Sequence, residues 1–331
     1  MKSLSTYISE AFKISSKTHL VKIKNVNGIN DLTQILSEEI KKCKEDNNPI
    51  LDLSFIRFID EFIDSRQKSL DYLFNNYLYN EEKITTLDIT GWNLEKFEKI
   101  DGLFRHCNYI EKIIGLDKLD LSNVYSASGL FSYCTSLDFS CVKNLKVKGI
   151  KILSCAFSSN EMDNLDFLID WDISECEDIS DMFFSCKRLT NIDGIKNWNV
   201  SSLKNSYSLG KNREGINGLF NHCYSLEHVD LSGWTLGKNI FWLNKVFSDC
   251  YSLKTIKMFN VTEIIKRAES LFEDCDQLES IENIKNWKIS NNAYCDSMFY
   301  HCTKLVIDLR HWNLKATGSK KIKTGANKVK I

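Results

Sequence analysis

The stretch from Leu219 to Trp234 reads LFNHCYSLEHVDLSGW. It joins an aliphatic residue followed by Phe220, a cysteine three positions later, and an apolar run that ends at the tryptophan. Apolar and polar side chains alternate within residues 226–231, which is typical of a half-buried strand. The stretch therefore predicts a corner at the phenylalanine, a strand, and a turn at Trp234.

This pattern occurs nine times along the chain. Its phenylalanines lie 25 to 30 residues apart except for one step of 37, and they are Phe74, Phe104, Phe131, Phe157, Phe183, Phe220, Phe247, Phe272 and Phe299. A tryptophan follows by 13 to 15 positions in five repeats, namely Trp171, Trp198, Trp234, Trp287 and Trp312. Tyr77 and Asn160 replace the cysteine in two degenerate copies. A fixed step of this size indicates stacked repeats.

A single repeat is too small to bury both faces of its strand, but stacking covers each strand with its neighbours and produces one continuous core. The sequence therefore predicts an α/β fold in which about nine repeats of 25–30 residues form a curved solenoid over residues 70–314. Its strands are expected to be parallel and to line one face. At about 4.8 Å per rung, the rod would be roughly 40 Å long.

Residues 1–69 do not repeat and are predicted to form an N-terminal α/β cap. Apolar residues at helical spacing predict an amphipathic helix, and they are Leu4, Tyr7, Ile8, Ala11 and Phe12. A strand is expected near Val21, a second helix over 32–40, and the strand of a first, degenerate repeat at 50–54. The amphipathic helix either covers the end of the solenoid or docks onto another protein.

Residues 315–331 form a basic C-terminal tail with six lysines and no acidic residue. Such a tail either steers the protein toward an acidic partner, nucleic acid or a membrane surface, or is a solvated, mobile end.

The pattern F-x-x-C-x-x-L-x-x-I-D-L-S-x-W, clearest from Phe220 to Trp234, resembles the BspA-type leucine-rich repeats of bacterial surface proteins. The resemblance covers roughly residues 70–314 and implies a leucine-rich-repeat solenoid that acts by binding, as an adhesin or interaction surface. Members of that family usually carry an export signal or a lipid-attachment cysteine. The start of this chain lacks the apolar core of about 7 to 15 residues that a signal peptide needs. A cytoplasmic location is therefore predicted.

Residues 1–14 are also similar to the starts of some tailed-bacteriophage proteins. That similarity implies a phage product, which would act in the host cytoplasm or leave with the virion.

Seven of the twelve cysteines occupy the same repeat position. They are expected to form a ladder of buried free thiols, with disulfides and a metal site as alternatives. His106, His222 and His301 each precede a ladder cysteine, but they lie in widely separated repeats. No zinc site and no cofactor are predicted, since adjacent residues seldom converge on one ion.

Polar residues between the apolar strand positions are expected to project from the strand face. The candidates for partner binding there are Asp166, Asp193, His228, Asp230, Lys257, Glu282 and Asp308, and Asp88 lies on a comparable rung. A column of carboxylates is favourable if it is solvated, hydrogen-bonded or matched by a cationic partner. It is either a docking strip for a basic surface or a set of aspartates that each bond the backbone of their own turn.

The 37-residue step contains an insertion at residues 204–215. Insertions in repeat arrays emerge as loops that often carry recognition. Tyr207 and Arg213 are residue types enriched at binding hot spots, so they are candidate partner-binding residues. The alternative is a tolerated surface loop.

The composition excludes several classes of protein. The net charge is −1, which disfavours specific nucleic-acid binding, and no apolar run is long enough for a membrane span. No nucleotide-binding, metalloprotease or serine-hydrolase motif is present, so no enzyme is predicted. Two hypotheses follow: a non-catalytic module that binds another protein, or a structural or adhesive component of a virion or cell surface.

Overall fold

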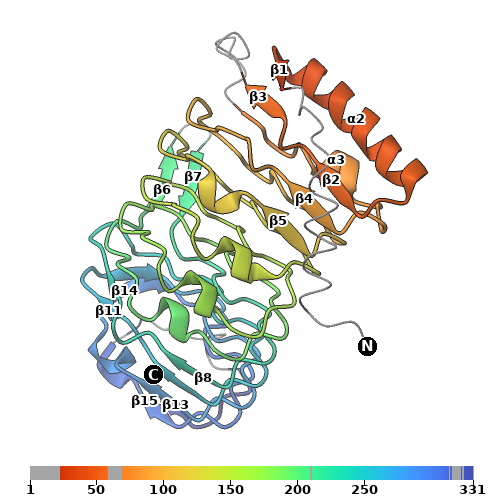
Figure 1. The fold of residues 1–331 in the computed structure, drawn as a ribbon. Helices are drawn as coiled ribbons and strands as arrows, with labels where there is room; N and C mark the ends of the chain where they lie inside the picture. Colours follow the sequence, from red (N-terminus) through yellow and green to blue (C-terminus); the bar gives the residue numbers. More distant parts are fainter. Residues whose placement is uncertain are drawn as a thin grey trace.

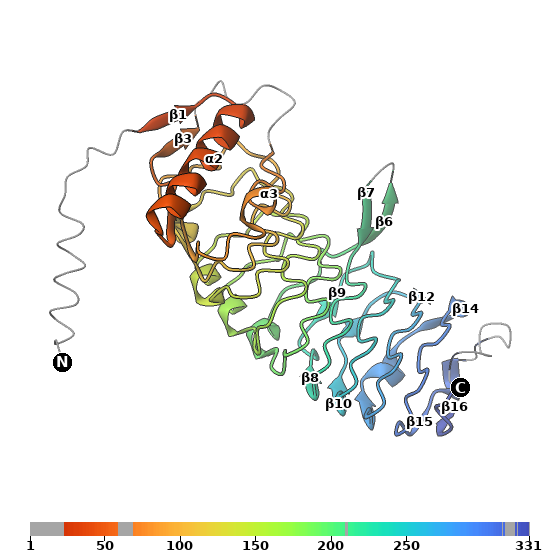
Figure 2. The same ribbon diagram turned by 90° about the vertical axis from the view of Figure 1, so that its right-hand side faces the viewer.

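The computed structural model describes residues 23–58, 69–208, 211–312, 314, 322 and 324–330. The chain coils into a solenoid of stacked turns, and helix α2 covers its N-terminal end (Figure 1). The turns advance along one axis from α2 to the C-terminal end, and the stack is curved (Figures 1 and 2). The predicted solenoid is confirmed.

One side of the solenoid carries the segments that follow the Phe corners, and we call it the strand face. Its elements in chain order are β2 (Ile50–Asp52), β4 (Thr86–Asp88), β5 (Lys112–Ile114), the 3₁₀ helices η3 (Phe139–Val142), η4 (Asp166–Leu168) and η5 (Asp193–Ile195), β8 (His228–Asp230), β10 (Thr255–Lys257), β13 (Ser280–Glu282) and β15 (Ile307–Asp308). All pairings among these strands are parallel, in the orders β2-β4-β5 and β13-β10-β8.

The expectation of a strand in every repeat is wrong for the three central turns, where a 3₁₀ helix takes its place. In each of them an Asp or Asn side chain accepts a hydrogen bond from the N–H two residues later, and these residues are Asp138, Asn164 and Asn191. Asn191 lies eight residues after Phe183, as His228 at the start of β8 lies eight residues after Phe220. A local side-chain bond at the point where the strand would begin favours a tight turn instead.

A second parallel ladder runs along the other side, just before the Phe corners, and we call it the return face. It consists of single bridges and of the strands β12 (Ile265–Arg267) and β14 (Ile289–Tyr294). The bridges link Ser69, Lys99, Ser126, Ile152 and Asp178 in sequence, and Trp242 to Arg267. Short strands β9 (Thr235–Leu236) and β11 (Asn260–Val261) pair after the tryptophan turns. Further 3₁₀ turns are η2 (Leu116–Lys118), η6 (Ile284–Asn286) and η7 (Arg310–Trp312).

The phenylalanines of the nine repeats stack along the core. Neighbouring ring centroids are 5.4 to 6.0 Å apart and the ring planes differ by 4 to 17°. The backbone at each corner continues the same ladder: the N–H of Phe220, for example, donates to the carbonyl of Val246 in the next repeat at 2.9 Å. Stacked offset rings contribute about 0.5 to 1.5 kcal/mol per pair beyond their buried area.

The cysteines of the repeat position form the predicted ladder of buried free thiols, and all twelve cysteines of the chain are free. Six thiols donate to the carbonyl of the phenylalanine in the preceding repeat at 2.9 to 3.2 Å, and they belong to Cys134, Cys186, Cys223, Cys250, Cys275 and Cys302. Burial raises the pKa of the Cys186 thiol to about 12. The disulfide alternative is therefore wrong.

The N-terminal cap contains α2 (Ile29–Asp46), whose buried face is Leu32, Ile35, Leu36, Ile40 and Cys43. Strand β1 (Lys24–Val26) pairs with β3 (Ile56–Phe58), and the short helix α3 is Asn75–Leu78. The predicted second helix and the strand of the first, degenerate repeat are thus found, whereas the strand expected near Val21 lies at 24–26 in the described part of the chain.

The described residues near the C-terminus do not match the expectation of a solvated end. Ile322, Ala326 and Val329 are buried, and β16 (Val329–Lys330) pairs in parallel with β15. The N–H of Phe299 donates to the carbonyl of Ile322 at 2.8 Å, as each Phe corner does toward its successor. These apolar residues extend the ladder by one partial turn and cover the last repeat, because an uncovered end would expose the core.

Candidate functional site

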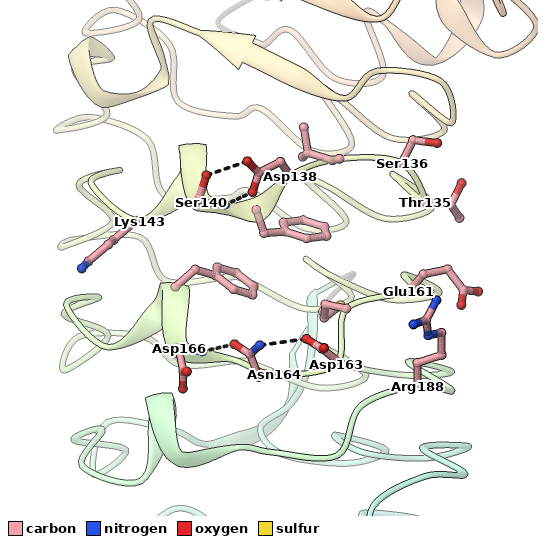
Figure 3. A pocket seen from close by; sticks show the side chains of 14 residues that line it. Thr135, Ser136, Asp138, Ser140, Lys143, Glu161, Asp163, Asn164, Asp166 and Arg188 are labelled. Atoms are coloured by element: carbon pink, nitrogen blue, oxygen red, sulfur yellow. Dashed lines mark hydrogen bonds between the residues drawn. The ribbon is translucent and has the colours of Figure 1, made fainter.

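The strand face is hollowed between the turns that carry η3 and η4, where a cleft of about 590 Å³ opens (Figure 3). At five other steps of this face one carbonyl accepts two successive N–H groups of the next turn, as Asp163 does from Thr190 at 2.8 Å and Asn191 at 3.2 Å. Among the described residues, no backbone hydrogen bond joins 136–140 to 162–166. The cleft therefore lies at an interruption of the backbone ladder.

Aromatic and aliphatic side chains line the inner part of the cleft. The Phe139 and Phe167 rings stack with centroids 5.1 Å apart and planes 20° apart, and Leu137 and Met162 also line the cleft. Phe139 packs in turn against Phe131 and Phe157 of the core ladder. The apolar part of the cleft is thus held rigidly by the core beneath it.

Charged side chains surround this apolar part, and four are acidic while two are basic: Asp138, Glu161, Asp163, Asp166, Lys143 and Arg188. Figure 3 places Glu161 and Arg188 side by side at one end and Lys143 at the other. Lys143 lies 4.0 Å from Asp170, outside the lining. Counting only lining residues, the cleft has a net charge of two negative units, from four acids and two bases.

The acidic side chains differ in how fully they are bonded. Asp138 accepts hydrogen bonds from both the N–H and the hydroxyl of Ser140, at 2.9 and 2.8 Å. Asp163 accepts one from the side-chain nitrogen of Asn164 at 2.8 Å, and the N–H of Asp166 donates to the Asn164 oxygen at 3.0 Å. Asp163, Asp166 and Glu161 are exposed, so their remaining acceptor capacity faces solvent in this structure.

The other predicted strand-face residues do not form one acidic column. Asp230 lies opposite Lys257, which lies opposite Glu282, and the Asp230 carboxylate is 3.5 Å from the Lys257 ammonium. His228 contacts the hydroxyl of Thr255 through Nδ1 at 2.8 Å. Opposite charges therefore alternate along β8, β10 and β13, because Lys257 occupies the middle rung.

Several aspartates bond their own turns, as the alternative interpretation expected. Asp88 binds the N–H and hydroxyl of Thr90, and Asp230 does the same with Ser232. Asp308 pairs with the Arg310 side chain at 2.7 Å, which holds the pKa of that carboxyl well below its usual range. Asp166 and Asp193 differ, because their N–H groups donate to the side chain of the Asn two residues earlier. Their own carboxylates are exposed to solvent.

The insertion at 204–215 forms a hairpin of β6 (Asn205–Ser208) and β7 (Lys211–Glu214), and all other strand pairs among the described residues are parallel. Tyr207 pairs with Asn212, and Arg213 pairs with Ser206. The hairpin protrudes from the return-face side of the molecule (Figure 2). The insertion thus emerges from the stack, as predicted.

A group of aromatic and basic side chains beside the hairpin was not predicted. These residues, which we call the return-face cluster, are Phe241, Trp242, Lys266, Arg267 and Tyr294. The adjacent pair Phe241-Trp242 does not follow the repeat pattern, and this is the feature of the sequence that could have indicated the cluster. Neighbouring members come from different repeats, so only the stacking brings them together.

The predicted docking helix with Leu4, Tyr7, Ile8 and Phe12 lies outside the described residues, as does the segment with phage similarity. No group of three or more His, Cys, Asp or Glu side chains in the described part of the chain is placed to hold a metal ion. His106, His222 and His301 all adopt positive φ at the Phe corners. Over the same residues, no helix combines the length and apolar character needed to cross a membrane.

A comparison with solved structures matches leucine-rich-repeat proteins of bacteria. A Bacteroides ovatus protein is 17% identical, with 69% of this chain and 67% of that chain covered and a TM-score of 0.30. A Eubacterium ventriosum protein is 12% identical, with 83% of this chain and 76% of that chain covered and a TM-score of 0.34. A leucine-rich cell surface protein of Faecalibacterium prausnitzii is 15% identical, with 71% of this chain and 80% of that chain covered and a TM-score of 0.20. No curated protein matches the chain.

One protein family matches repeatedly along the solenoid, over residues 68–167, 98–218, 151–236 and 214–330. Together these matches span the Phe corners from Phe74 to Phe299 and the partial turn at the C-terminal end. The chain therefore belongs to the family described as Mycoplasma protein of unknown function, DUF285.

Proposed function

We propose that the protein is a non-catalytic module that binds another protein and takes a basic segment of that partner into the strand-face cleft. The observation that carries this proposal is the combination of stacked Phe139 and Phe167 with an excess of carboxylates around them. Lys and Arg side chains have an apolar stem and a cationic head, so they match a cleft that is apolar inside and acidic at the rim.

The two parts of the cleft would act on different parts of the partner's side chain. The aromatic rings would contact the aliphatic stem and attract the cation, an interaction of about 0.5 to 2 kcal/mol depending on desolvation. Asp163 and Asp166 present carboxylate oxygens at the rim, which would pair with a guanidinium or ammonium group. The broken backbone ladder provides the room between the turns.

A titration with a labelled basic peptide tests the proposal. A fluorescein-labelled peptide of Arg, Lys and Ser would be titrated with the full chain, and the same peptide with Gln in place of its basic residues serves as the control ligand. Asp163→Asn with Asp166→Asn should weaken binding about tenfold, because two charge-assisted contacts are lost. Phe167→Ala should weaken it to a similar degree by removing the aromatic surface.

Asp276→Asn with Asp117→Asn removes the same charge at exposed positions outside the cleft and should leave the affinity nearly unchanged. Equal losses in the cleft variant and in this control would show that only net charge matters, which would refute binding in the cleft.

A structural role on a virion or cell surface is the second candidate. The stacked phenylalanine ladder favours it, since ring stacking continues without interruption from Phe74 to Phe299 and gives a stiff, extended body. Co-sedimentation of the chain with particles or cell envelopes, unaffected by the cleft substitutions, would support this role over the first.

A further inference from the structure

The return-face cluster holds its cations against aromatic rings. The Arg267 guanidinium lies 6.0 Å from the centroid of Trp242 and 5.0 Å from that of Tyr294. The Lys266 ammonium lies 4.6 Å from the centroid of Phe241. Tyr294 is 59% exposed, and Phe241 and Trp242 are both partly exposed, so the rings and cations together form an accessible surface.

Ring contacts restrict the cations of this cluster before any partner arrives. A guanidinium that lies against aromatic rings loses less freedom on binding, and its planar fork matches a carboxylate. Arg267 lies beside Glu269, whose carboxylate is 3.8 Å away and partly solvated. Arg267 therefore has donors left for a carboxylate of another molecule, given the five N–H groups of the guanidinium.

A buried side chain ties the hairpin to this cluster. Asn205, which is 6% exposed, accepts hydrogen bonds through its side-chain oxygen from the N–H groups of Phe241 and Trp242, at 2.9 and 2.8 Å. Its side-chain nitrogen donates to the carbonyl of Glu214 at 2.9 Å, across the base of the hairpin. A single buried amide thus fixes the first residue of β6, the last residue of β7 and the aromatic pair relative to one another.

The segment that forms the hairpin is basic in sequence. Residues 204–215 contain three basic residues, Lys204, Lys211 and Arg213, and one acidic residue, Glu214, for a net charge of two positive units. With Lys266 and Arg267 the sequence of these segments supplies five basic residues, against Glu214 and two acidic residues that pair with them: Glu177, 2.9 Å from Lys204, and Glu269, 3.8 Å from Arg267. Five basic and three acidic residues give a net charge of two positive units, which is opposite in sign to that of the strand-face cleft.

We propose that the hairpin β6–β7 and the return-face cluster form a second docking surface, which binds an acidic segment of a protein partner. Trp, Tyr and Arg are the residue types that dominate protein-binding hot spots, and this surface groups all three. A nucleic acid fits less well, because its binding relies on neutralising many phosphates along a basic stripe. Here the cations are few and Glu269 lies among them.

The probe is a fluorescein-labelled peptide of Glu, Asp and Ser, and the matched peptide with Gln and Asn in place of its acids is the control ligand. We expect the acidic peptide to bind the full chain and the neutral peptide to bind at least about tenfold more weakly. The double substitution Lys266→Gln with Arg267→Gln should reduce the affinity by about tenfold or more, and Trp242→Ala by a similar factor.

Lys118→Gln with Lys285→Gln removes the same charge at exposed positions elsewhere and should leave the affinity within about twofold of the unchanged chain. Replacing residues 206–213 by a short Gly-Ser turn tests the hairpin, with circular dichroism to confirm folding. Loss of affinity in the folded shortened chain supports its role.

Three results would overturn the proposal. The first is that the acidic peptide does not bind. The second is that the Lys118/Lys285 control loses as much affinity as the cluster variant. The third is that an oligo(dT) strand of the same length binds more tightly than the acidic peptide. The third would assign the surface to a single-stranded nucleic acid. The strand-face proposal is tested with a basic peptide and other variants, so either surface can fail alone.

Discussion

Asn160 donates a hydrogen bond from its side-chain nitrogen to the backbone carbonyl of Phe131 at 2.8 Å. In the neighbouring repeats a cysteine thiol makes this bond, as Cys134 does to Phe104 at 2.9 Å. The same Asn160 nitrogen also reaches the carbonyl of Phe157 at 2.9 Å. The degenerate repeat therefore keeps the interaction of the ladder while it changes the residue.

Asn160→Ala should destabilise the protein by about 2 to 3 kcal/mol, because the Phe131 and Phe157 carbonyls would lose a buried donor and a cavity would open. Asn160→Cys should retain most of the stability, since a thiol makes this bond in six other repeats. Denaturant unfolding followed by circular dichroism measures both. If the Cys variant were as unstable as the Ala variant, the donor at this position would not matter.

The ladder cysteines should resist N-ethylmaleimide at pH 8 in the native protein. Burial raises the pKa of the Cys186 thiol to about 12 and keeps the reagent away from the sulfur. Cys141 and Cys155 are partly exposed and should react before the ladder cysteines. Mass spectrometry of the modified protein over time, with and without denaturant, identifies the sites. Rapid labelling of Cys186 or Cys250 without denaturant would contradict the packing described above.

Asp181 should make the stability depend on pH. Desolvation by burial, followed by the nearby carboxylates Glu214 and Asp178, raises the pKa of Asp181 to about 6 from an ordinary value near 3.8. The folded state therefore binds a proton more tightly than the unfolded state does. The resulting stability is present below pH 4 and is lost as the pH rises through 6.

Asp181→Asn should consequently raise the free energy of unfolding by about 1 to 2 kcal/mol above pH 7 and have little effect at pH 4. Urea unfolding at pH 4, 5, 6, 7 and 8 gives the comparison. A stability difference that stayed constant across this range would mean that the carboxyl of Asp181 does not titrate as proposed.

Two tryptophans of the same repeat position should respond differently to Phe substitution. The Trp234 indole nitrogen donates to the carbonyl of Ile195 at 2.9 Å, whereas that of Trp312 has no hydrogen-bond partner among the described residues. Both side chains are buried. Trp234→Phe should therefore cost about 1 kcal/mol more than Trp312→Phe, because it removes one of the two hydrogen bonds that the Ile195 carbonyl accepts, the other coming from the N–H of Trp198 at 3.1 Å. Equal losses would assign the role of Trp234 to packing alone.

The solenoid was predictable because periodicity survives in the sequence. Phe220, Cys223 and Trp234 recur at a nearly constant step, and a stacked repeat places equivalent residues on top of one another. The free thiols followed from the same argument, since each cysteine packs beneath the same corner in every turn. The insertion at 204–215 was likewise predictable, because it makes the step between Phe183 and Phe220 longer than the other steps.

The central 3₁₀ turns were not predictable from the alternation of residues. Asn164 and Asn191 replace the start of a strand by bonding the backbone locally, and a single side-chain contact of this kind leaves little trace in a hydrophobic pattern. The strand-face cleft depends on these turns, so the sequence pattern identifies only one of its lining residues, Asp166.

The return-face cluster shows most directly what stacking adds. Trp242, Arg267 and Tyr294 lie roughly 25 residues apart in sequence, and none of them belongs to the repeating pattern. They meet because adjacent turns place their return segments side by side, as the pairings of Arg267 with Trp242 and Tyr294 record. Residues that keep the period reveal the scaffold in the sequence. Residues that do not follow the period make their contacts only in the folded solenoid, because contacts between turns join positions that are far apart in the sequence and that no local pattern relates.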